Sequence, residues 1–579
     1  MEDMKDFIDC AMKREPCDLV IRNARILNVF TGEMEEGEIA VKDGIIVGIG
    51  SGYVTRKAYD GAGMVFLPGL IDAHIHVEST MLTPEVFASL TVPHGTSGIV
   101  ADPHELVNVC GIAGAEYLVA AFARLAPSPL DVYVQLPSCV PATPFETSGA
   151  TLDAAETRLQ LARDTFFGLG EMMNYVGVIA GEKEVLGKLE AAKAFSKIVD
   201  GHAPGVAGDA LNAYLCGGIA TDHESLSESE IREKIARGMY IQVRCGSSTN
   251  NIVAAAKCIT AENFPRFLLC TDDKHAHDLI TAGHLDDALR RLVAAGVSPY
   301  HAVRAATLNV ATCYRLQGRG AIAPGYHADL VAVEDVASFR VQAVFKDGRL
   351  VAEHGKALFS ANETYLPDAV RGTVRVKEVT ADDFRLPLKG DRARAMRVVD
   401  NDLVTNSVIV PVQKRDGDVV LHGTSLNKLA VVERHFASGN IGLALVEDYG
   451  LKGGAIGISV AHDSHNLVIL GDDNAAMARV VALLKEAGGG MALVDGEGEE
   501  VFPLDIAGLM SSLPADEVAS RIEHISRRAY QMGVRPCYDS FMTLAFLSLA
   551  VIPHLKLTDR GLFDVDKFTF TSTEIEADE

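Results

Sequence analysis

The feature that most constrains the fold is a series of eight short apolar segments between Leu67 and Asp272, separated by stretches with helical patterns. Each interval between successive segment ends, 21 to 36 residues, accommodates a strand, a helix and two short loops. Eight parallel strands with intervening helices close into a (β/α)8 barrel. The sequence therefore predicts an α/β protein built around a TIM-like barrel, with strand ends near His74, His104, Gln135, Glu171, His202, His223, Cys245 and Asp272.

Short alternating strands precede and follow the predicted barrel. Residues 17–63 contain such strands, with Asp43-Gly44 as a hairpin turn, and residues 318–335 and 341–355 return to the same alternation. We expect these segments to form one small β-sandwich. From about Ala381 a third region mixes strands with a capped helix, which indicates an α+β domain. The predicted boundaries are 1–66 and 326–380 for the β-sandwich, 67–325 for the metal-binding barrel and 381–579 for the C-terminal domain.

Composition excludes several classes of protein. A chain of 579 residues that is 48% hydrophobic can bury the cores of two to four domains, and its formal net charge of -25 disfavours nucleic-acid binding. The ten cysteines include no Cys-x-x-Cys pair, which is typical of a reducing compartment. We expect no signal peptide, because the N-terminal residues are charged and contain no apolar run, and the apolar run 541–552 is too short to span a bilayer. We expect a soluble cytoplasmic protein.

The sharpest local motif is PGLIDAHIHVEST, in which His74 and His76 end an apolar run. Residues i and i+2 of a strand point to the same face, so both imidazoles would converge at the carboxyl end of the strand. Two surface histidines beside a turn are the alternative. The position at the functional rim of a barrel favours a pair of metal ligands.

Other polar residues are predicted to reach the same rim. Taken singly, each has a plain explanation: a helix start for Glu171, a loop hydrogen bond for His202, and a helix cap at or beside His223 and Asp272. Together with the His-x-His pair they supply four histidines and two carboxylates from five strands. Such a set has enough ligands for two divalent cations.

At this point a family resemblance emerges. The His-x-His on the first strand, the single histidines on the fifth and sixth, the aspartate on the eighth and the flanking β unit resemble the amidohydrolase superfamily. More closely, the chain resembles the adenine deaminase family over essentially its whole length. The runs that carry this closer resemblance are PGLIDAHIHVEST, ADPHELVNVCG, GLGEMMNY, DGHAPG, TDHES, CTDDKH and GISVAHDSHN.

The resemblance implies roles for individual residues. His74 and His76 would bind a first metal, His202 and His223 a second, and Glu171 would bridge the two. Many amidohydrolases have a carboxylated lysine where this chain has Glu171, which favours the adenine deaminase branch over dihydroorotase or hydantoinase. Asp272 would coordinate the first metal and transfer protons as a general acid-base group. The implied reaction is hydrolysis of adenine to hypoxanthine and ammonia in purine salvage.

The resemblance also implies the cofactor. Nitrogen and oxygen ligands without thiolate accept manganese, iron or zinc, and the family favours manganese. A different zinc-dependent nucleobase deaminase signature is half present in His76-Val77-Glu78, but its Pro-Cys-x-x-Cys partner is absent because Tyr538 and Asp539 follow Pro536-Cys537.

Two further clusters have weaker support. His104 and Glu105 follow the second predicted strand, where the resemblance implies an active-site or additional-metal role and a structural hydrogen bond is the alternative. His462, Asp463 and His465 follow a glycine-containing strand of the third region, where the alternatives are a solvated turn and a contribution to the active site.

Two rival functions remain open. The first is another binuclear amidohydrolase that cleaves a cyclic amide or a different aminated heterocycle. The second is a non-catalytic assembly protein with the same fold. It is disfavoured because all six ligand positions carry a histidine, glutamate or aspartate that can bind a metal. As partners we expect adenine and a second copy of the chain, as in a homodimer, but neither nucleic acid nor membrane.

Overall fold

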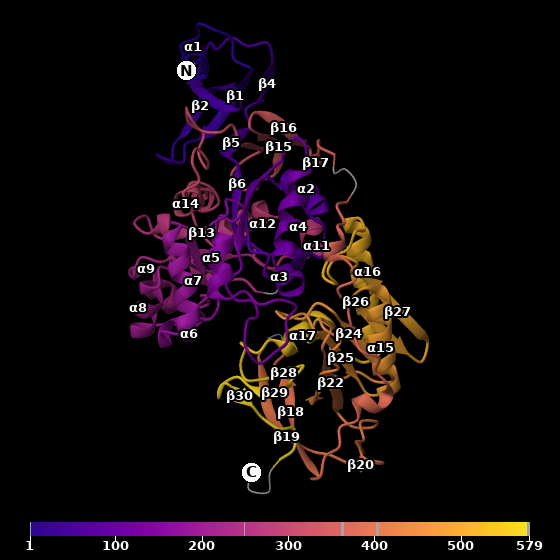
Figure 1. The fold of residues 1–579 in the computed structure, drawn as a ribbon. Helices are drawn as coiled ribbons and strands as arrows, with labels where there is room; N and C mark the ends of the chain where they lie inside the picture. The colour runs from indigo at the N-terminus through magenta and orange to yellow at the C-terminus, as the bar shows by residue number, and fades with distance from the viewer. Residues whose placement is uncertain (1, 248, 361–363, 401–403, 576–579) are drawn as a thin grey trace. The chain divides into compact units, whose positions relative to one another are not determined.

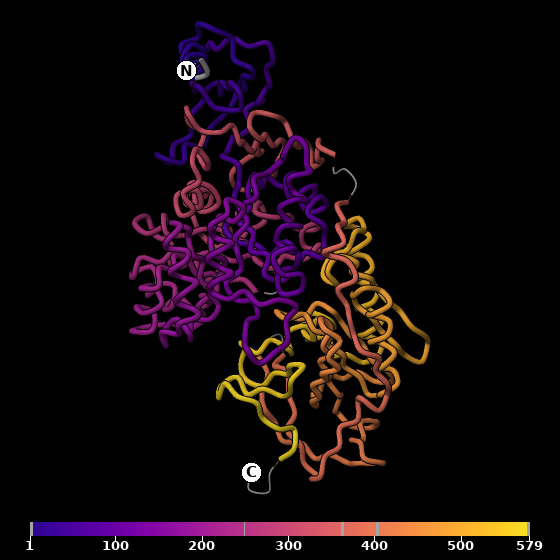
Figure 2. The backbone as a smooth tube through the Cα atoms, in the orientation of Figure 1, coloured from indigo at the N-terminus to yellow at the C-terminus, as the bar shows by residue number. Residues whose placement is uncertain are grey.

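The structure, a computed structural model, describes residues 2–247, 249–360, 364–400 and 404–575 (Figures 1 and 2). The chain forms two units, each made of segments that are separated in the sequence. The first unit comprises Met1–Asp102, Leu118–Ser138 and Asp153–Thr364, and the second comprises Pro103–Tyr117, Cys139–Leu152 and Tyr365–Glu579. Two short segments within the range predicted for the barrel therefore group with the second unit.

Parallel strands form the centre of the first unit. One five-stranded sheet runs in the order β10-β9-β8-β7-β6, and a three-stranded sheet runs in the order β11-β12-β13. The strands are β6 (Leu70–Ile75), β7 (Thr96–Ala101), β8 (Asp131–Leu136), β9 (Gly168–Met172), β10 (Ile198–Gly201), β11 (Thr221–Asp222), β12 (Tyr240–Arg244) and β13 (Phe267–Cys270).

Backbone hydrogen bonds join these two sheets at both edges. The N–H of Ala220, just before β11, donates to Val199 O on β10 at 2.9 Å. The N–H of Asp272, just after β13, donates to His74 O on β6, also at 2.9 Å. The eight strands thus follow one another around a ring, as in a TIM-like α/β fold.

Helices alternate with these strands, and local sequence explains where several begin. Thr83 caps α2 by accepting a hydrogen bond from Val86 N, with Pro84 in the first turn, and Ser227 caps α9 in the same way. The helices of this unit are α1 (Glu2–Ala11), α2 (Pro84–Thr91), α5 (Ala154–Leu161), α6 (Tyr175–Ala180), α7 (Lys183–Ala194), α8 (Gly208–Cys216), α9 (Glu228–Ala236), α10 (Ile252–Ala256), α11 (Ala276–Thr281), α12 (Leu285–Ala294), α13 (Pro299–Ala305) and α14 (Leu308–Cys313).

The strands before and after the barrel share one nine-stranded mixed sheet. β5 and β14 pair antiparallel and bring the two segments together, while Asp43 and Gly44 make the predicted hairpin with φ values of 47° and 79°. A facing second sheet, which a sandwich requires, stays a prediction. The strands are β1 (Leu19–Leu27), β2 (Met34–Lys42), β3 (Ile45–Gly50), β4 (Ala58–Asp60), β5 (Val65–Pro68), β14 (Leu330–Val333), β15 (Val341–Lys346), β16 (Arg349–Glu353) and β17 (Lys356–Ala357).

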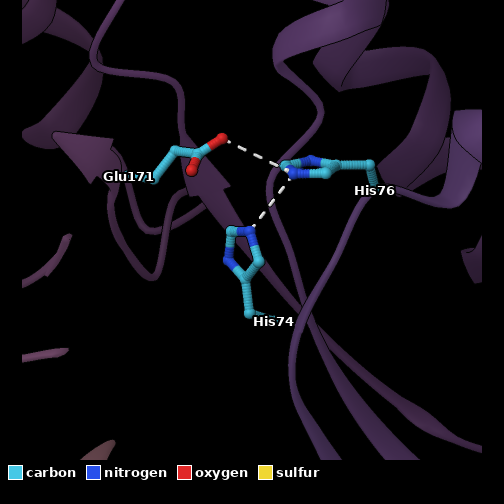
Figure 3. A group of neighbouring side chains, drawn as sticks. All are labelled: His74, His76 and Glu171. Carbon is cyan, nitrogen blue, oxygen red and sulfur yellow. Dashed lines mark hydrogen bonds and ion pairs between the residues drawn. The ribbon is translucent and has the colours of Figure 1, made fainter. Parts of the chain in front are cut away.

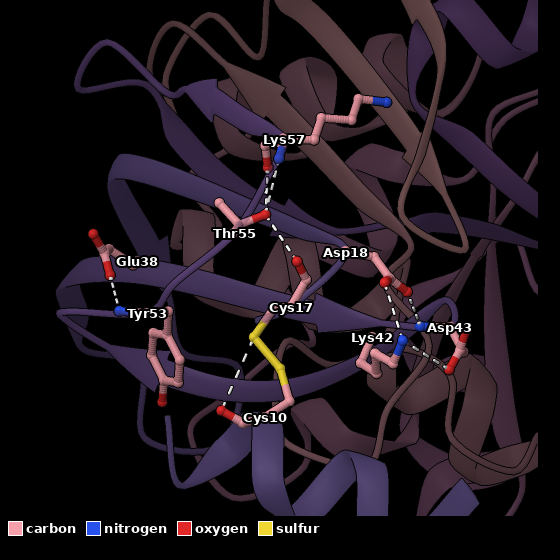
Figure 4. Close-up of a disulfide and its surroundings, with 9 residues drawn as sticks. All are labelled: Cys10, Cys17, Asp18, Glu38, Lys42, Asp43, Tyr53, Thr55 and Lys57. Carbon is pink, nitrogen blue, oxygen red and sulfur yellow. Dashed lines mark hydrogen bonds and ion pairs between the residues drawn. A yellow bond between two sulfur atoms is a disulfide. The ribbon is translucent and has the colours of Figure 1, made fainter. Parts of the chain in front are cut away.

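A disulfide joins Cys10 at the end of α1 to Cys17 just before β1 (Figure 4). Both residues are buried in a small apolar cluster with Val20 and Tyr53. The spacing of the cysteines did not predict this pair, because the chain reverses direction between them and brings their Cα atoms to 5.6 Å. The other cysteines are free thiols.

The second unit is built on an eight-stranded sheet in the order β19-β18-β23-β22-β25-β24-β26-β27. The predicted capped helix is α15 (Asn474–Ala487), which begins at the Asp473 cap and ends at Gly488 with φ 78°. Its apolar side packs on the sheet. The remaining elements are α3 (His104–Cys110), α16 (Ala515–Gln531), α17 (Met542–Ala545), β18 (Arg392–Val398), β19 (Thr405–Pro411), β20 (Lys414–Arg415), β21 (Asp418–Val419), β22 (Leu426–Val432), β23 (Ile441–Glu447), β24 (Ala455–Ile458), β25 (Leu467–Gly471), β26 (Gly490–Asp495), β27 (Gly498–Pro503), β28 (Leu555–Thr558), β29 (Gly561–Asp564) and β30 (Thr569–Phe570).

Helix α4 (Ile112–Ala123) begins in the second unit and ends in the first. None of the helices in the described ranges combines the length and the apolar character that a membrane crossing requires.

Candidate active site

Six predicted side chains meet at the carboxyl ends of five barrel strands. Five of them are buried, and His202 keeps partial exposure. We call this set the barrel cluster: His74, His76, Glu171, His202, His223 and Asp272.

The His-x-His pair converges as predicted. His74 lies on β6 and His76 directly follows it, and their Nε2 atoms are 3.2 Å apart. Asp272 faces both rings, with its Oδ1 atom 3.4 Å from His74 Nε2 and 3.0 Å from His76 Nε2. Asp272 itself has φ 57°, a left-handed conformation that turns the chain just after β13.

Glu171 lies between two groups of histidines, because each of its carboxylate oxygens faces a different group. Its Oε1 atom is 3.5 Å from His76 Nε2 (Figure 3). Its Oε2 atom is 2.9 Å from His202 Nδ1 and 3.0 Å from His223 Nε2. One side chain thus reaches both histidine groups, which is the geometry that the predicted bridging role requires.

Asp102 orients two members of the cluster. Its backbone carbonyl lies 2.8 Å from His76 Nδ1, so the proton of this ring resides on Nδ1 and Nε2 presents a lone pair to the cluster. Its Oδ2 atom accepts the Glu171 N–H at 2.9 Å. Gly170 makes room for this contact, since a Cβ atom there would lie 2.1 Å from Asp102 Oδ2.

A buried aspartate lies behind His74. Asp200 Oδ2 is 3.8 Å from His74 Nδ1 and accepts a hydrogen bond from the Tyr314 hydroxyl at 2.7 Å. The Thr221 hydroxyl donates to the other oxygen of Asp200 at 3.0 Å. These contacts hold the carboxylate where it can orient the His74 ring.

A buried lysine stabilises the two strand ends that carry His202 and His223. Lys234 Nζ donates to Ala203 O at 2.7 Å and to Asp222 Oδ2 at 3.0 Å. Asp222 Oδ1 in turn accepts the N–H of Ala203 at 2.8 Å. The backbones next to both histidines are therefore tied to one ammonium group.

The electrostatics of the cluster favour positive charge. Burial alone would lower the pKa of His202, but the carboxylates beside it raise it to about 9. The pKa of His74 is likewise raised well above its ordinary value, against the effect of burial, by Asp200 and Asp272. Burial would raise the pKa of Asp272, yet Arg244 and the neighbouring histidines hold it well below its usual range.

Sequence reasoning missed several charged residues around the cluster, including Asp102, Asp200 and Lys234 described above and also Arg244 and Glu224. Arg244 ends β12, and its guanidinium contacts the Glu224 and Asp272 carboxylates and lies 3.3 Å from Asp273 Oδ2. Glu224 Oε1 is 3.5 Å from His223 Nε2. An arginine at the end of the apolar run YIQVR was the available signal, because a charge at a barrel strand end faces the functional rim.

The donor set fits divalent cations. Ligand atoms of three overlapping triplets lie within 4.8 Å of one another, as atoms around a common cation would. Imidazole nitrogen and carboxylate oxygen without thiolate suit manganese, iron or zinc. The triplets are His74, His76 and Glu171; His74, His223 and Asp272; and Glu171, His202 and His223.

The weaker predicted residues lie in the second unit. His104 and Glu105 begin α3, while His462, Asp463 and His465 follow β24, and all five are buried. Glu105 contacts three histidines of this group. A contribution of these residues to the active site stays a prediction.

Comparisons with known proteins agree with this architecture. The amidohydrolase family profile matches residues 65–351, and the profile of the adenine deaminase C-terminal domain matches residues 402–569. The chain is 43% identical over 584 residues to adenine deaminase 2 of Desulfotalea psychrophila, covering 99% of each chain. It is 44% identical over 574 residues to adenine deaminase of Nitratidesulfovibrio vulgaris strain Hildenborough, again covering 99% of each. It is 42% identical over 570 residues to adenine deaminase of Clostridium acetobutylicum, covering 98% of this chain and 99% of the relative. The chain therefore belongs to the adenine deaminase family of amidohydrolases.

Proposed function

We propose that the protein hydrolyses adenine to hypoxanthine and ammonia, with two divalent cations held by the barrel cluster. The observation that carries the proposal is the position of Glu171, whose two oxygens face separate histidine groups. His74, His76 and Asp272 would hold one cation, His202 and His223 the other, and Glu171 would contact both. When bound, the cations would lower the pKa of water and so supply a nucleophile near neutral pH.

Asp272 is the candidate for proton transfer. Arg244 contacts its Oδ2 atom, while its Oδ1 atom points toward the histidines. The carboxylate would take a proton from the attacking water as the bond from oxygen to C6 of adenine forms. It would return that proton to the exocyclic nitrogen as the C6–N bond breaks, so ammonia leaves and hypoxanthine remains.

The test is a product assay with purified protein. Protein loaded with Mn²⁺ should release one ammonia per hypoxanthine formed from adenine, and chelation should abolish both products. Adenosine should be a much poorer substrate, because its ribose would have to fit a pocket shaped for the free base. Untouched adenine together with opening of dihydroorotate, hydantoin or a dihydropyrimidine would instead favour the cyclic-amide alternative.

Cation content separates an enzyme from a non-catalytic relative of the same fold. We propose manganese as the native cation, with iron and zinc as alternatives that the same ligands accept. Protein isolated with no bound cation and unable to take up any after dialysis would favour the assembly-protein alternative. The homodimer remains a prediction, which light scattering coupled to size-exclusion chromatography can test.

A further inference from the structure

A second group of buried histidines surrounds a carboxylate in the second unit. Glu105, on α3, is 2% exposed, and its Oε1 atom lies 2.5 Å from His462 Nδ1 and 3.2 Å from His104 Nε2. Its Oε2 atom contacts His465 Nε2. We call His104, Glu105, His462 and His465 the α3 cluster.

The three histidines of the α3 cluster have different roles. The backbone N–H of Ala461 donates to His465 Nδ1 at 3.0 Å, so the neutral ring carries its proton on Nε2. That N–H donates to Glu105 Oε2, which leaves His465 unable to bind a cation through the same nitrogen. His465 therefore orients the carboxylate, as hydrogen-bond donors behind metal-binding carboxylates do.

The other carboxylate oxygen faces the two remaining rings. Both His104 Nε2 and His462 Nδ1 lie within 3.2 Å of Glu105 Oε1, so three potential ligand atoms converge on one place. The His462 ring stacks on Phe546 at 4.6 Å with an interplanar angle of 15°, which restrains its orientation. Two imidazole nitrogens and one carboxylate oxygen are a donor set that zinc and manganese accept.

Charge provides a separate argument. In the part of the chain that the structure describes, the partners of the Glu105 carboxylate are histidines, which carry positive charge only when protonated, with neither lysine nor arginine among them. A buried carboxylate is costly unless positive charge compensates it. A divalent cation among the three atoms would provide that compensation.

We propose that the second unit binds one divalent cation through Glu105 Oε1, His104 Nε2 and His462 Nδ1, in addition to the cations proposed for the barrel cluster. The cation would be structural, because it would join α3 to a loop whose first ligand lies 357 residues further along the chain. This proposal does not depend on the substrate of the enzyme.

Metal stoichiometry tests the proposal directly. Protein stripped with a chelator and dialysed against Mn²⁺ or Zn²⁺ should bind three cations per chain by elemental analysis. Glu105→Gln keeps the size of the side chain but removes its charge, and His462→Asn removes a ligand, so each variant should bind two. His435→Asn is the matched control and should bind three, because His435 is a buried histidine of the same unit that contacts Ser464 O at 2.7 Å.

Thermal unfolding provides a second readout. Zn²⁺ should raise the unfolding temperature more in the stripped wild type and in His435→Asn than in Glu105→Gln, because a ligand stabilises the state that binds it and Glu105→Gln keeps only the barrel cluster as a binding site. The deciding quantity is the difference of one cation between wild type and the α3 variants, whatever number the barrel cluster binds. Equal cation counts in wild type and Glu105→Gln would overturn the proposal, and His462→Asn provides the same comparison if Glu105→Gln fails to fold.

Discussion

The barrel cluster and the α3 cluster both surround buried carboxylates with histidines, but they are built differently. In the barrel cluster the side chains project from the ends of parallel strands, and each strand end is set by its neighbours in the sheet. In the α3 cluster a helix supplies the glutamate, and a loop 357 to 360 residues away supplies two of the histidines. The barrel cluster can therefore be predicted from the spacing of the strands, whereas the α3 cluster depends on tertiary packing.

The largest expected effect is that of Glu171→Gln, which removes the charge shared by both histidine groups of the barrel cluster. Turnover should fall by about 10³-fold, or about 4 kcal/mol of transition-state stabilisation, and cation occupancy should fall with it. Elemental analysis and steady-state kinetics on adenine measure the two effects. Glu190→Gln, an exposed glutamate on α7, is the control and should match wild type. Near-normal turnover with full occupancy in Glu171→Gln would remove Glu171 from the bridging role.

Asp272→Asn should separate cation binding from proton transfer within the same cluster. The four histidines and Glu171 remain to hold most of the metal, so turnover should fall by about 10²-fold with little loss of cation. Asp209 is an exposed aspartate on α8, so Asp209→Asn is the control for the loss of an aspartate charge and should match wild type. If added metal restores activity to Asp272→Asn, the residue is chiefly a ligand.

Glu146 is a buried carboxylate of the second unit whose pKa is shifted in the opposite direction from that of Asp272. Burial and the nearby Asp463 raise its pKa from 4.5 to about 8. Between pH 4.5 and about pH 8 the folded state keeps a proton on Glu146 that the unfolded state has released. The contribution of Glu146 to stability therefore decreases as the pH rises through this range. Between pH 6 and pH 8 this loss should be about 2 kcal/mol.

Glu146→Gln should abolish that loss, since the amide does not titrate. Calorimetry should show that the unfolding temperature of the variant, relative to wild type, is higher at pH 8 than at pH 6. Glu497→Gln, at an exposed position, should follow the wild-type pH dependence. A constant difference between Glu146→Gln and wild type would mean that Glu146 is ionised throughout.

The smallest expected effect on turnover is that of Asp200→Asn, which changes a residue behind His74 without touching the substrate. Loss of an outer partner of a metal-binding histidine costs about 10-fold in activity or metal affinity. Titration of stripped protein with Mn²⁺ should show weaker binding of one cation. Unaltered binding and turnover would show that the 3.8 Å separation between Asp200 and His74 is too long to matter.

Much of the barrel and its cluster could be predicted because the physical rule is local. An apolar run that ends in a histidine, glutamate or aspartate places that side chain at the strand end, as for His74 on β6 and Glu171 on β9. Arg244 was missed because it was assigned to the strand, although it is the charged residue at the end of β12.

The remaining features depend on contacts between distant parts of the chain. The pairing of Glu105 with His462 joins residues 357 positions apart, and periodicity carries no information about such a contact. The Cys10–Cys17 disulfide depends on the chain reversal after α1, which the spacing of the two cysteines does not reveal.

Gly170 has a consequence for the mutational tolerance of the protein. Its missing Cβ leaves room for the Asp102 carboxylate, which accepts the Glu171 N–H, while the Asp102 carbonyl orients His76. Even Gly170→Ala should therefore displace two members of the barrel cluster at once, although glycine has no side chain to bind anything. In a saturation screen for growth on adenine as purine source, position 170 should be as intolerant as a metal ligand, and a functional alanine there would show that Asp102 can move without disturbing the site.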